Sequence, residues 1–350
     1  MKAVILAGGE GTRLRPLTLT TPKPVVPVVD RPFLRHQLDL LASAGVREVV
    51  FSVAYRPERV EAVFGDGSAL GLRIRYAVEE SPLGTGGAVR NALDLLDERT
   101  VVLNGDVLTD VDLPAIIARH EAEKAQATIL LTPVPNPSAY GLVETDAEGR
   151  VRRFVEKPRP EQITTHEINA GIYVLETRVL EMMPPGVNTS IERVFFPALL
   201  ARGDRVLGPV HRGYWIDIGT PEKYLQVHRD ILNRRFRVPL AGAPRADGFV
   251  HEGAEVAAGA FLDGHFYVGP GCVVGEGARL GPDAVLVADV RVERGAYVRD
   301  SVLWAGTRVG ADCEVEGSLI GPGVRLGASS RLRGAVLGEG SVVSDFSRTL

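Results

Sequence analysis

The chain opens with a stretch that combines an apolar strand, a glycine-rich turn and fixed positive charge. Residues 3–6, Ala-Val-Ile-Leu, predict a buried strand of a parallel sheet. The glycines of the turn that follows are Gly8, Gly9 and Gly11. Residues without a Cβ leave backbone N–H groups open to an anion. The basic side chains beside the turn are Arg13, Arg15 and Lys23. This pattern predicts a site for the phosphate chain of a nucleotide.

Two common phosphate-binding loops do not match this stretch. A Walker loop needs a glycine, four residues and then Gly-Lys-Ser/Thr, and the chain contains no such run. A dinucleotide fingerprint needs a third glycine three residues after Gly11, where this chain has Leu14. The loop therefore indicates a different class of nucleotide site.

A second glycine-rich loop and an aspartate lie at the ends of other predicted strands. The loop, residues 79–87, follows a strand predicted at 73–78 and opens a helix predicted at 88–96. Asp106 follows a strand predicted at 100–103. Ligands of open α/β sheets bind at the carboxyl ends of the strands, so we expect both glycine loops and Asp106 to converge there.

Strands and helices alternate through residues 1–233. A helix is predicted at 33–44, a strand at 49–53 and a short helix at 57–64. This alternation predicts an α/β catalytic domain over residues 1–233, with a doubly wound, mixed but mainly parallel sheet similar to a Rossmann fold.

The last hundred residues have a different, repetitive pattern. Pairs of an aliphatic residue and a glycine recur every six residues, as at 268–269, 274–275 and 280–281. An aliphatic residue at every sixth position points inward once per short strand, and three such units form one coil. We predict a left-handed parallel β-helix over 249–350, preceded by a linker at 234–248 that is rich in Arg, Pro, Ala and Gly.

The composition argues against several other classes of protein. The 40 Lys and Arg residues nearly balance 44 Asp and Glu residues, so we expect no partner nucleic acid and no membrane surface. No apolar run approaches the roughly 20 residues of a membrane span, and we see no signal-peptide pattern. Cys272 and Cys313 lie far apart without a zinc-ligand spacing. We expect two buried thiols in a reducing cytoplasm.

The N-terminal run as a whole resembles the signature of a known family. Gly-Gly-x-Gly-Thr-Arg-Leu stands at 8–14 and Pro-Lys-Pro at 22–24, as in the sugar-1-phosphate nucleotidyltransferases, also called nucleotide-sugar pyrophosphorylases. The family motif Phe-x-Glu-Lys-Pro is matched at 154–158, and Trp-x-Asp-Ile-Gly-Thr-Pro at 215–221. The resemblance covers nearly the whole chain.

Four features are most similar to the mannose-1-phosphate guanylyltransferases within this family. They are Pro-Leu-Gly-Thr-Gly-Gly at 82–87, Thr-Ser-Ile-Glu at 189–192, the Trp-x-Asp-Ile-Gly-Thr-Pro run at 215–221 and the β-helix tail. One departure is Gly105 in Asn-Gly-Asp at 104–106, where that subgroup often has Asn-Ser-Asp. The aspartate of the motif is retained.

The resemblance implies nucleotidyl transfer, in which a sugar 1-phosphate oxygen attacks the α-phosphorus of an NTP and pyrophosphate leaves in line. The nucleophile is already an anion, so the protein needs no general base. It must hold two polyanions together with cations and Mg²⁺.

The resemblance also implies roles for individual residues. The expected catalytic residues are Arg13, Lys23, Asp106 and Lys157. The expected metal ligands are Asp106 and Asp217. The expected sugar-phosphate site comprises Gly141, Glu156, Lys157 and Asn169. The expected nucleotide site comprises Leu6, Ala7, Gly8, Gly9, Gly11, Thr12, Arg13, Lys23, Glu79, Glu80, Pro82, Gly84, Thr85, Gly105 and Asp106.

The loop at 79–87 also carries information about the base. Guanine presents two adjacent donors, which one carboxylate can accept, whereas uracil and thymine suit an amide better. The loop contains Glu79 and Glu80 and no Gln, which favours GTP.

Other interpretations of the sequence stay open. The substrate pair could be that of a glucose-1-phosphate thymidylyltransferase or uridylyltransferase, and Arg15 could serve a salt bridge instead of a phosphate. A non-catalytic regulatory subunit could share the fold. The repeats could form an acyltransferase, but its histidine base would have to be His251 or His265, near the first coil. We expect instead that the repeats associate copies of the chain.

Overall fold

The computed structural model describes residues 1–349 and divides the chain into two compact units. The first unit comprises Met1–Gly9 and Leu34–Trp215, and the second comprises Glu10–Phe33 together with the chain from Ile216 onward. The segment that carries Arg13 and Lys23 is therefore part of the same unit as the repeats. The domain boundaries expected from the sequence stay a prediction.

The parallel part of the first unit's sheet contains the strands with polar residues at their ends. The main path of this nine-stranded sheet runs β10-β9-β11-β6-β1-β4-β5. β1 (Lys2–Leu6) pairs in parallel with both β4 (Glu48–Val53) and β6 (Arg99–Asn104), and β5 (Arg73–Val78) pairs in parallel with β4. The carboxyl ends of these strands consequently lie at one edge of the sheet.

The rest of this sheet is antiparallel, except that β12 (Val206–Leu207) pairs in parallel with β8 (Ala127–Pro133). β11 (Glu167–Glu176) runs antiparallel to β6 and to β8 (Ala127–Pro133). The other strands of this part are β9 (Gly141–Thr145), β10 (Val151–Glu156) and β12 (Val206–Leu207), while β7 (Val107–Thr109) follows β6 directly. The predicted mixed, mainly parallel α/β fold is confirmed.

Helices connect the strands of the first unit. They are α1 (Phe33–Ser43), α2 (Pro57–Phe64), α3 (Gly84–Asn91), α4 (Leu113–Ala122) and α5 (Phe196–Ala201), which a π-helix (Ile191–Phe195) precedes. α2 has proline in its first turn, a position without a helical N–H partner. α3 begins at Gly84, four residues before the start predicted at Ala88, because the glycines of the second loop already form its first turn.

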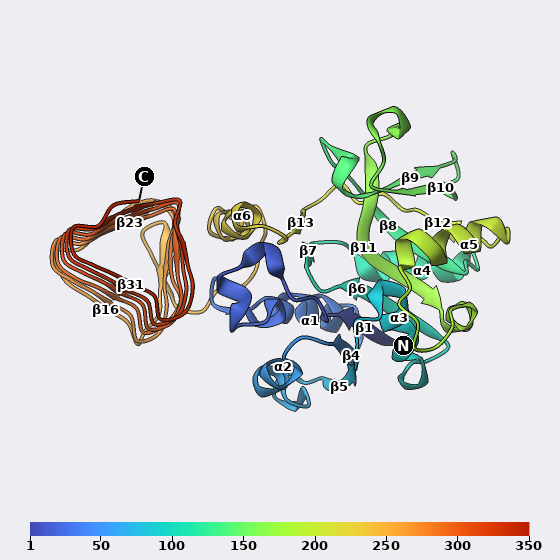
Figure 1. Ribbon diagram of the computed structural model, residues 1–350, viewed down its shortest axis with the longest axis horizontal. Helices are drawn as coiled ribbons and strands as arrows, with labels where there is room; N and C mark the ends of the chain where they lie inside the picture. Colours follow the sequence, from blue (N-terminus) through green and yellow to red (C-terminus); the bar gives the residue numbers. More distant parts are fainter. Residues whose placement is uncertain (350) are drawn as a thin grey trace. The chain divides into compact units, whose positions relative to one another are not determined.

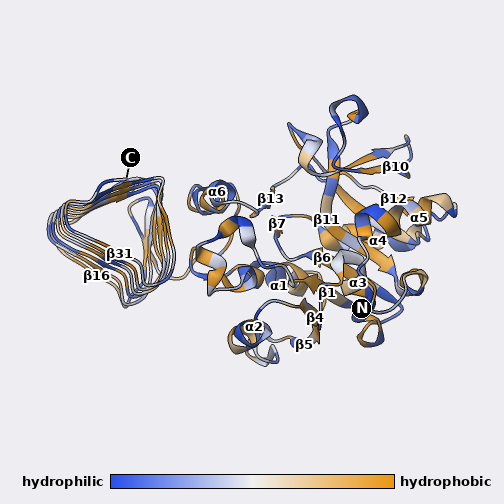
Figure 2. Ribbon diagram, viewed as in Figure 1, coloured by the Kyte–Doolittle hydropathy of each residue, from blue (hydrophilic) through white to orange (hydrophobic). Residues whose placement is uncertain are grey.

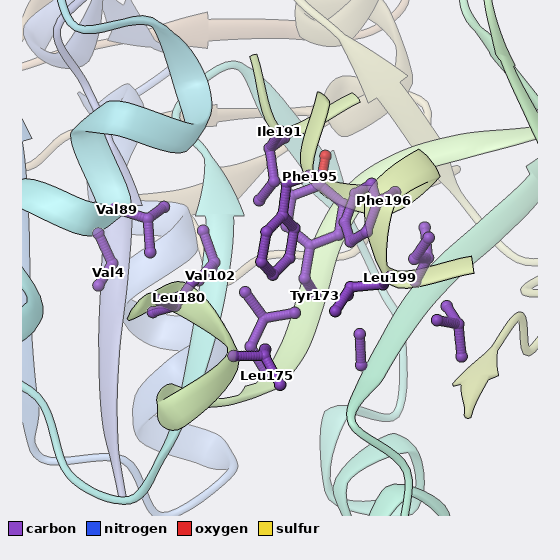
Figure 3. Packing of buried hydrophobic residues seen from close by; sticks show 14 of the residues in the cluster. Val4, Val89, Val102, Tyr173, Leu175, Leu180, Ile191, Phe195, Phe196 and Leu199 are labelled. Atoms are coloured by element: carbon purple, nitrogen blue, oxygen red, sulfur yellow. The ribbon is translucent and has the colours of Figure 1, made fainter. Parts of the chain in front are cut away.

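Aromatic side chains fill the core of the first unit on the side of β11. The ring of Tyr173 lies 5.1 Å from that of Phe196, and Phe195 lies 5.5 Å from Phe196, between centroids. Figure 3 shows these rings together with Ile191 and Leu199. Figure 2 shows the hydrophobic colour of β11, which carries Tyr173. Three buried aromatic rings here anchor the π-helix and α5 against the sheet.

The second unit contains a parallel β-helix with three faces, whose stacked coils Figure 1 views nearly end-on. The first face consists of β14 (Ala243–Arg245), β15 (Gly248–Val250), β18 (Phe266–Val268), β21 (Ala284–Leu286), β24 (Val302–Leu303), β27 (Leu319–Ile320) and β30 (Val336–Leu337). The second face consists of β16 (Glu255–Val256), β19 (Val273–Val274), β22 (Arg291–Val292), β25 (Arg308–Val309), β28 (Arg325–Leu326) and β31 (Val342–Val343). The third face consists of β17 (Phe261–Leu262), β20 (Arg279–Leu280), β23 (Tyr297–Arg299), β26 (Glu314–Glu316) and β29 (Arg331–Arg333).

The predicted parallel β-helix is confirmed, and its interior follows the six-residue pattern. Val274, Val292 and Val309 stack inward from successive coils of the second face. Cys272 and Cys313 are free, buried thiols of this core, as expected, and burial raises the pKa of Cys272 to about 11. β14, in the segment predicted as a linker, pairs antiparallel with β15.

The outward column of the first face is apolar and also buried. Its members are Tyr267, Val285, Val302 and Leu319. The helix α6 (Pro221–Leu232) contacts this side of the β-helix, where Arg229 forms a two-pronged ion pair with Asp300 at 2.5 and 2.6 Å. The α6 residue Tyr224 meets the Trp304 ring at 6.3 Å, between centroids.

The opposite side of α6 holds the N-terminal segment of the second unit. The Tyr224 hydroxyl donates to the carbonyl of Pro27, and the Val29 N–H donates to Nδ1 of His228 at 3.3 Å. The segment contains the short antiparallel pair β2 (Pro27–Val28) and β3 (Arg31–Pro32). α6 therefore ties this segment to the β-helix. Within residues 1–349, every helix is too short or too polar to cross a bilayer.

Candidate active site

The turn after β6 lies against the end of β1. The Gly105 N–H donates to the Leu6 carbonyl at 2.9 Å, and the Ala7 N–H donates to Ser52 at 2.8 Å. A Cβ at Gly105 would lie 2.4 Å from the Leu6 oxygen, so only glycine allows this approach. The first unit thereby brings Leu6, Ala7, Gly105 and Asp106 together, as predicted from the strand order.

Gln37 stabilises this turn from α1. Its side-chain amide donates to the carbonyls of Asn104 at 2.8 Å and Val107 at 2.7 Å, which lie on either side of Asp106. This residue was not among the site candidates predicted from the sequence. The available signal was its place on the apolar face of α1, between Leu34 and Leu41, where a polar side chain needs a buried partner.

Glu79 is built into the second glycine loop. One oxygen of its carboxylate accepts from the Ser52 hydroxyl at 2.9 Å, and the other accepts from the Leu83 N–H at 2.9 Å. A Cβ at Gly8 would lie 2.9 Å from the first of these oxygens. Glu79 is 9 % exposed, whereas Glu80 is exposed and faces solvent. Reading of the base by these two residues stays a prediction, with Glu80 the more accessible carboxylate.

The remaining nucleotide-site candidates of the first unit differ in exposure. Pro82 and Gly84 are exposed, and Thr85 is half-buried. Gly9 has open space where a Cβ would stand. These residues therefore present backbone and small side chains at the loop surfaces, which suits contact with a ligand.

Three of the predicted sugar-phosphate residues lie on neighbouring strands. Gly141 of β9 is the register partner of Glu156 of β10, and a Cβ at Gly141 would lie 3.0 Å from the Glu156 carboxylate. Asn169 lies on β11, next to Ile168, which pairs with Leu142 of β9. The Asn169 amide donates to the Tyr173 hydroxyl at 2.8 Å and accepts from the Gly171 N–H at 2.9 Å.

Lys157 follows β10 in an unusual backbone conformation. Its φ is 51°, in the left-handed region that non-glycine residues seldom adopt, and its N–H donates to the Tyr140 carbonyl at 2.9 Å. The side chain is exposed. Burial raises the pKa of the neighbouring Glu156 first, the charge of Glu192 raises it further, and the charges of Lys157 and Arg193 oppose this rise.

Two predicted site residues of the second unit are Arg13 and Asp217, the last residue of β13 (Trp215–Asp217). A Cβ at Gly219 would lie 2.6 Å from the Arg13 guanidinium, so Arg13 covers the turn that follows Asp217. Asp217 forms an ion pair with Lys223 of α6, a cation that our sequence analysis missed. The signal for it was its spacing, six residues after Asp217 and in the first turn of α6.

The glycine turn of the second unit is held by local contacts. Gly11 has φ 63°, and its carbonyl accepts from the Thr18 hydroxyl at 2.7 Å. Thr12 begins a short 3-10 helix (Thr12–Leu14), and Lys23 is 9 % exposed. Arg15 forms an ion pair with Glu10 at 2.6 Å, the alternative that the sequence left open for it. Gly11, Thr12, Arg13, Lys23 and Asp217 thus share one unit, and the other site candidates share the first.

The carboxylates suit a metal that binds mainly to phosphate. Within residues 1–349 no three His, Cys, Asp or Glu side chains gather into a self-sufficient metal site. Mg²⁺ typically takes only one or two carboxylates and completes its shell with phosphate oxygens and water. The carboxylates of Asp106 and Asp217 are donors of that kind, and Asp217 forms an ion pair with Lys223.

The comparisons with known proteins match this arrangement of motifs. Residues 2–234 match the nucleotidyl transferase family, and residues 262–347 match the GMPPB C-terminal domain. The chain belongs to the nucleotidyl transferase family. The resemblance stated from the N-terminal run is therefore confirmed, and the protein is a nucleotidyltransferase.

Members of the family with named activities cover most of this chain. A mannose-1-phosphate guanylyltransferase of Mycobacterium tuberculosis is 46% identical over 298 residues, which are 85% of this chain and 82% of that protein. A UTP–glucose-1-phosphate uridylyltransferase of Synechocystis is 33% identical over 334 residues, 82% of this chain and 86% of that protein. The crystal structure of HddC from Yersinia pseudotuberculosis with GMP-PN has a TM-score of 0.56 at 31% identity, over 65% of this chain and 97% of HddC.

Proposed function

We propose that this nucleotidyltransferase transfers GMP from GTP to mannose 1-phosphate and gives GDP-mannose and pyrophosphate. The observation that carries the choice of substrates is the 46% identity to a mannose-1-phosphate guanylyltransferase over 85% of the chain. The uridylyltransferase relative is less similar, at 33%. Glu80, an exposed carboxylate in the second glycine loop, supports guanine because a carboxylate can accept both donors of that base.

The reaction exchanges one phosphorus–oxygen bond for another. A phosphate oxygen of the sugar 1-phosphate bonds to the α-phosphorus, and the bond from this phosphorus to the bridging oxygen breaks, so pyrophosphate leaves with the electron pair. A bound Mg²⁺ would neutralise phosphate charge and hold the reacting groups in line. Asp106 and Asp217 would hold that ion.

The cationic side chains have separate tasks in this proposal. Arg13 and Lys23 stabilise the charge of the β- and γ-phosphates, and Lys157 holds the phosphate of the sugar. Glu156 and Asn169 accept hydrogen bonds from sugar hydroxyls, and Gly141 leaves room for the ring. The left-handed backbone at Lys157 supports a functional role for this residue, since such strain accumulates at ligand sites.

The direct test measures pyrophosphate release with each combination of GTP, UTP, dTTP or ATP and mannose or glucose 1-phosphate. We expect the fastest turnover with GTP and mannose 1-phosphate. Faster turnover with UTP or dTTP would overturn the base assignment. Nucleotide-sugar binding without any turnover would instead identify a regulatory subunit.

Asp106→Asn tests the role of the candidate metal ligand. We expect turnover to fall by about 100-fold or more, since the variant loses a charge aimed at the phosphates. The control is Asp94→Asn, which removes an exposed carboxylate on the turn after α3. Equal activity of Asp106→Asn and the unaltered protein at saturating Mg²⁺ would remove Asp106 from the mechanism.

Two further expectations concern the protein as a whole. The free, buried cysteines fit a reducing compartment, and we propose the cytoplasm. We also propose that the β-helix associates copies of the chain into a homo-oligomer. The molar mass of the full chain in light scattering tests this, and a monomer at all concentrations would contradict it.

A further inference from the structure

Glu192, in the first turn of the π-helix, has no role in the function proposed above. We infer that Glu192 is a positioning residue shared by the two substrate sites, which anchors the second glycine loop through Thr85 and sets the electrostatic environment of Glu156. This inference rests on the proposed function, because it takes the loop as part of the nucleotide site and Glu156 as part of the sugar site.

A closed set of hydrogen bonds carries the first half of the inference. The hydroxyls of Thr85 and Ser190 both donate to the same Glu192 oxygen, each at 2.7 Å. The Thr85 oxygen accepts from the Ile191 N–H at 2.9 Å, and the Ser190 oxygen accepts from the Arg193 N–H at 3.1 Å. Each hydroxyl therefore accepts from the backbone and directs its one hydrogen at Glu192. An ionised acceptor makes both of these bonds stronger than neutral ones.

The segment around Glu192 also supports the loop backbone. The Gly86 and Gly87 N–H groups donate to the Thr189 carbonyl at 2.8 and 3.1 Å, and the Thr189 N–H donates back to Leu83 at 2.8 Å. A Cβ at Gly87 would lie 2.5 Å from the Val187 oxygen. Loop and segment thus fit together closely, and the Thr85 side chain of the loop reaches across to Glu192.

The second half of the inference concerns charge. β10, which ends at Glu156, packs against the π-helix that carries Glu192, and the Phe154 ring of β10 lies 5.5 Å from the Phe196 ring, between centroids. The charges that act on Glu156 are those of Glu192, Lys157 and Arg193. Burial raises the pKa of Glu156, and the negative charge of Glu192 raises it again. Burial also raises the pKa of Tyr173, and the Glu192 charge adds to that rise. The charge of Glu192 therefore adds to the effect of burial on the pKa of Glu156.

A simple capping role does not account for these contacts. A glutamate in the first turn of a helix, beside a capping serine, stabilises the helix start by itself. That role explains Ser190. It does not explain Thr85, which lies 107 residues earlier in the chain and directs its hydroxyl hydrogen to the same oxygen.

Two substitutions of Glu192 separate its hydrogen bond to Thr85 from the effect of its charge on Glu156. Glu192→Gln keeps an oxygen that can accept from both hydroxyls but removes the charge, so the acidic limb of kcat/KM for the sugar 1-phosphate should move to lower pH. Glu192→Ala also releases Thr85, and KM for the NTP should rise by about tenfold, the effect of one lost hydrogen bond to a charged group. Glu58→Gln, which removes an exposed carboxylate on α2, is the matched control and should change neither.

The outcomes distinguish this inference from the proposed function. If both Glu192 variants keep the KM values and the pH profile of the unaltered protein and lose only thermal stability, Glu192 is a capping residue and the inference fails. If the unaltered protein releases no pyrophosphate with any substrate pair, the proposed function fails. Calorimetric affinity for GTP then decides the inference: a weaker affinity of Glu192→Ala supports it, and equal affinities, or no binding by either protein, overturn it.

Discussion

The sheet of the first unit and the β-helix of the second both align parallel strands, but they use the chain in opposite ways. In the sheet, loops are held by segments from far along the chain, such as Gly105 against Leu6. In the β-helix, strands of successive coils pair in parallel, as Arg291 with Arg308 and Arg308 with Arg325. The candidate site residues of the sheet lie where segments distant in the chain meet, whereas the coils of the β-helix present columns of side chains on their outer faces.

The faces of the β-helix extend this contrast. The outward column of the first face is apolar and buried, whereas the outward column of the second face stacks Arg291, Arg308 and Arg325, all exposed. On the third face, arginines alternate with glutamates, as in the ion pair of Arg299 with Glu316. Coils of one repeating shape thus carry three different surfaces, because the outward residues of their strands differ from face to face.

The largest difference is expected between Gly105→Ala, which should abolish turnover, and Gly323→Ala, which should lower stability only. A Cβ at Gly105 would meet the Leu6 oxygen at 2.4 Å, so Gly105→Ala should cost about 1–3 kcal/mol of stability and abolish turnover by displacing Asp106. Gly323, at a corner of the β-helix, has no atom within 4 Å of a Cβ, and its φ of 65° alone makes alanine cost roughly 1–2 kcal/mol. Urea unfolding and pyrophosphate release measure both effects. Loss of turnover in Gly323→Ala would contradict the assignment of the candidate chemistry to the sheet and not to the coils.

Acid should destabilise the first unit through His120. This buried ring lies 2.8 Å from the Thr128 hydroxyl and 3.3 Å from Glu176, and burial lowers its pKa, as does the charge of Arg99. The unfolded chain then binds the proton more readily, so stability falls as the pH drops below about 6.5, by at most about 1.4 kcal/mol at pH 5.5.

Glu176 adds to this loss at lower pH. Burial raises its pKa, but hydrogen bonds from Arg99 and His120 outweigh this and lower it overall. We expect His120→Asn to flatten the dependence of the unfolding midpoint on pH between 7.5 and 5.5. An unchanged slope in His120→Asn would show that other groups cause the acid sensitivity.

The smallest effect is expected on the second face of the β-helix. Arg291, Arg308 and Arg325 stack on strands about 4.8 Å apart, and none of them forms an ion pair with another of residues 1–349. Arg308→Gln should raise stability by a few tenths of a kcal/mol at low salt, and the gain should vanish at 1 M salt. Arg299→Gln, which breaks the pair with Glu316, should lower stability under the same conditions. Destabilisation by Arg308→Gln at low salt would contradict repulsion in the column.

The sequence predicted the elements that depend on local pattern. The apolar run at 3–6 became β1, helix α2 formed at the predicted residues, and the six-residue repeat became the β-helix. These features follow from the spacing of apolar side chains, which is visible within one segment of chain.

The supports of the candidate site could not be predicted in the same way. Gln37 donates to the carbonyls of Asn104 and Val107, and Glu192 accepts from Thr85. These partners lie far apart in the chain, and no local pattern connects them. Glu79 was expected to read the base, and nothing in its sequence neighbourhood indicated that Ser52 and Leu83 would occupy its oxygens. Long-range hydrogen bonds depend on the complete fold, so only the structure reveals them.

The position of α6 has a practical consequence for shortening this protein. A fragment ending at residue 233, close to the limit of the family match, would strip Tyr224 of the Trp304 ring and leave Arg229 without Asp300. The face of α6 that packs on the β-helix would then be exposed to solvent, with the apolar Tyr224 ring and the charged Arg229 on the same helix as the contacts to the N-terminal segment. We therefore expect a fragment ending at residue 233 to unfold at a lower temperature than the full chain, because α6 loses these partners.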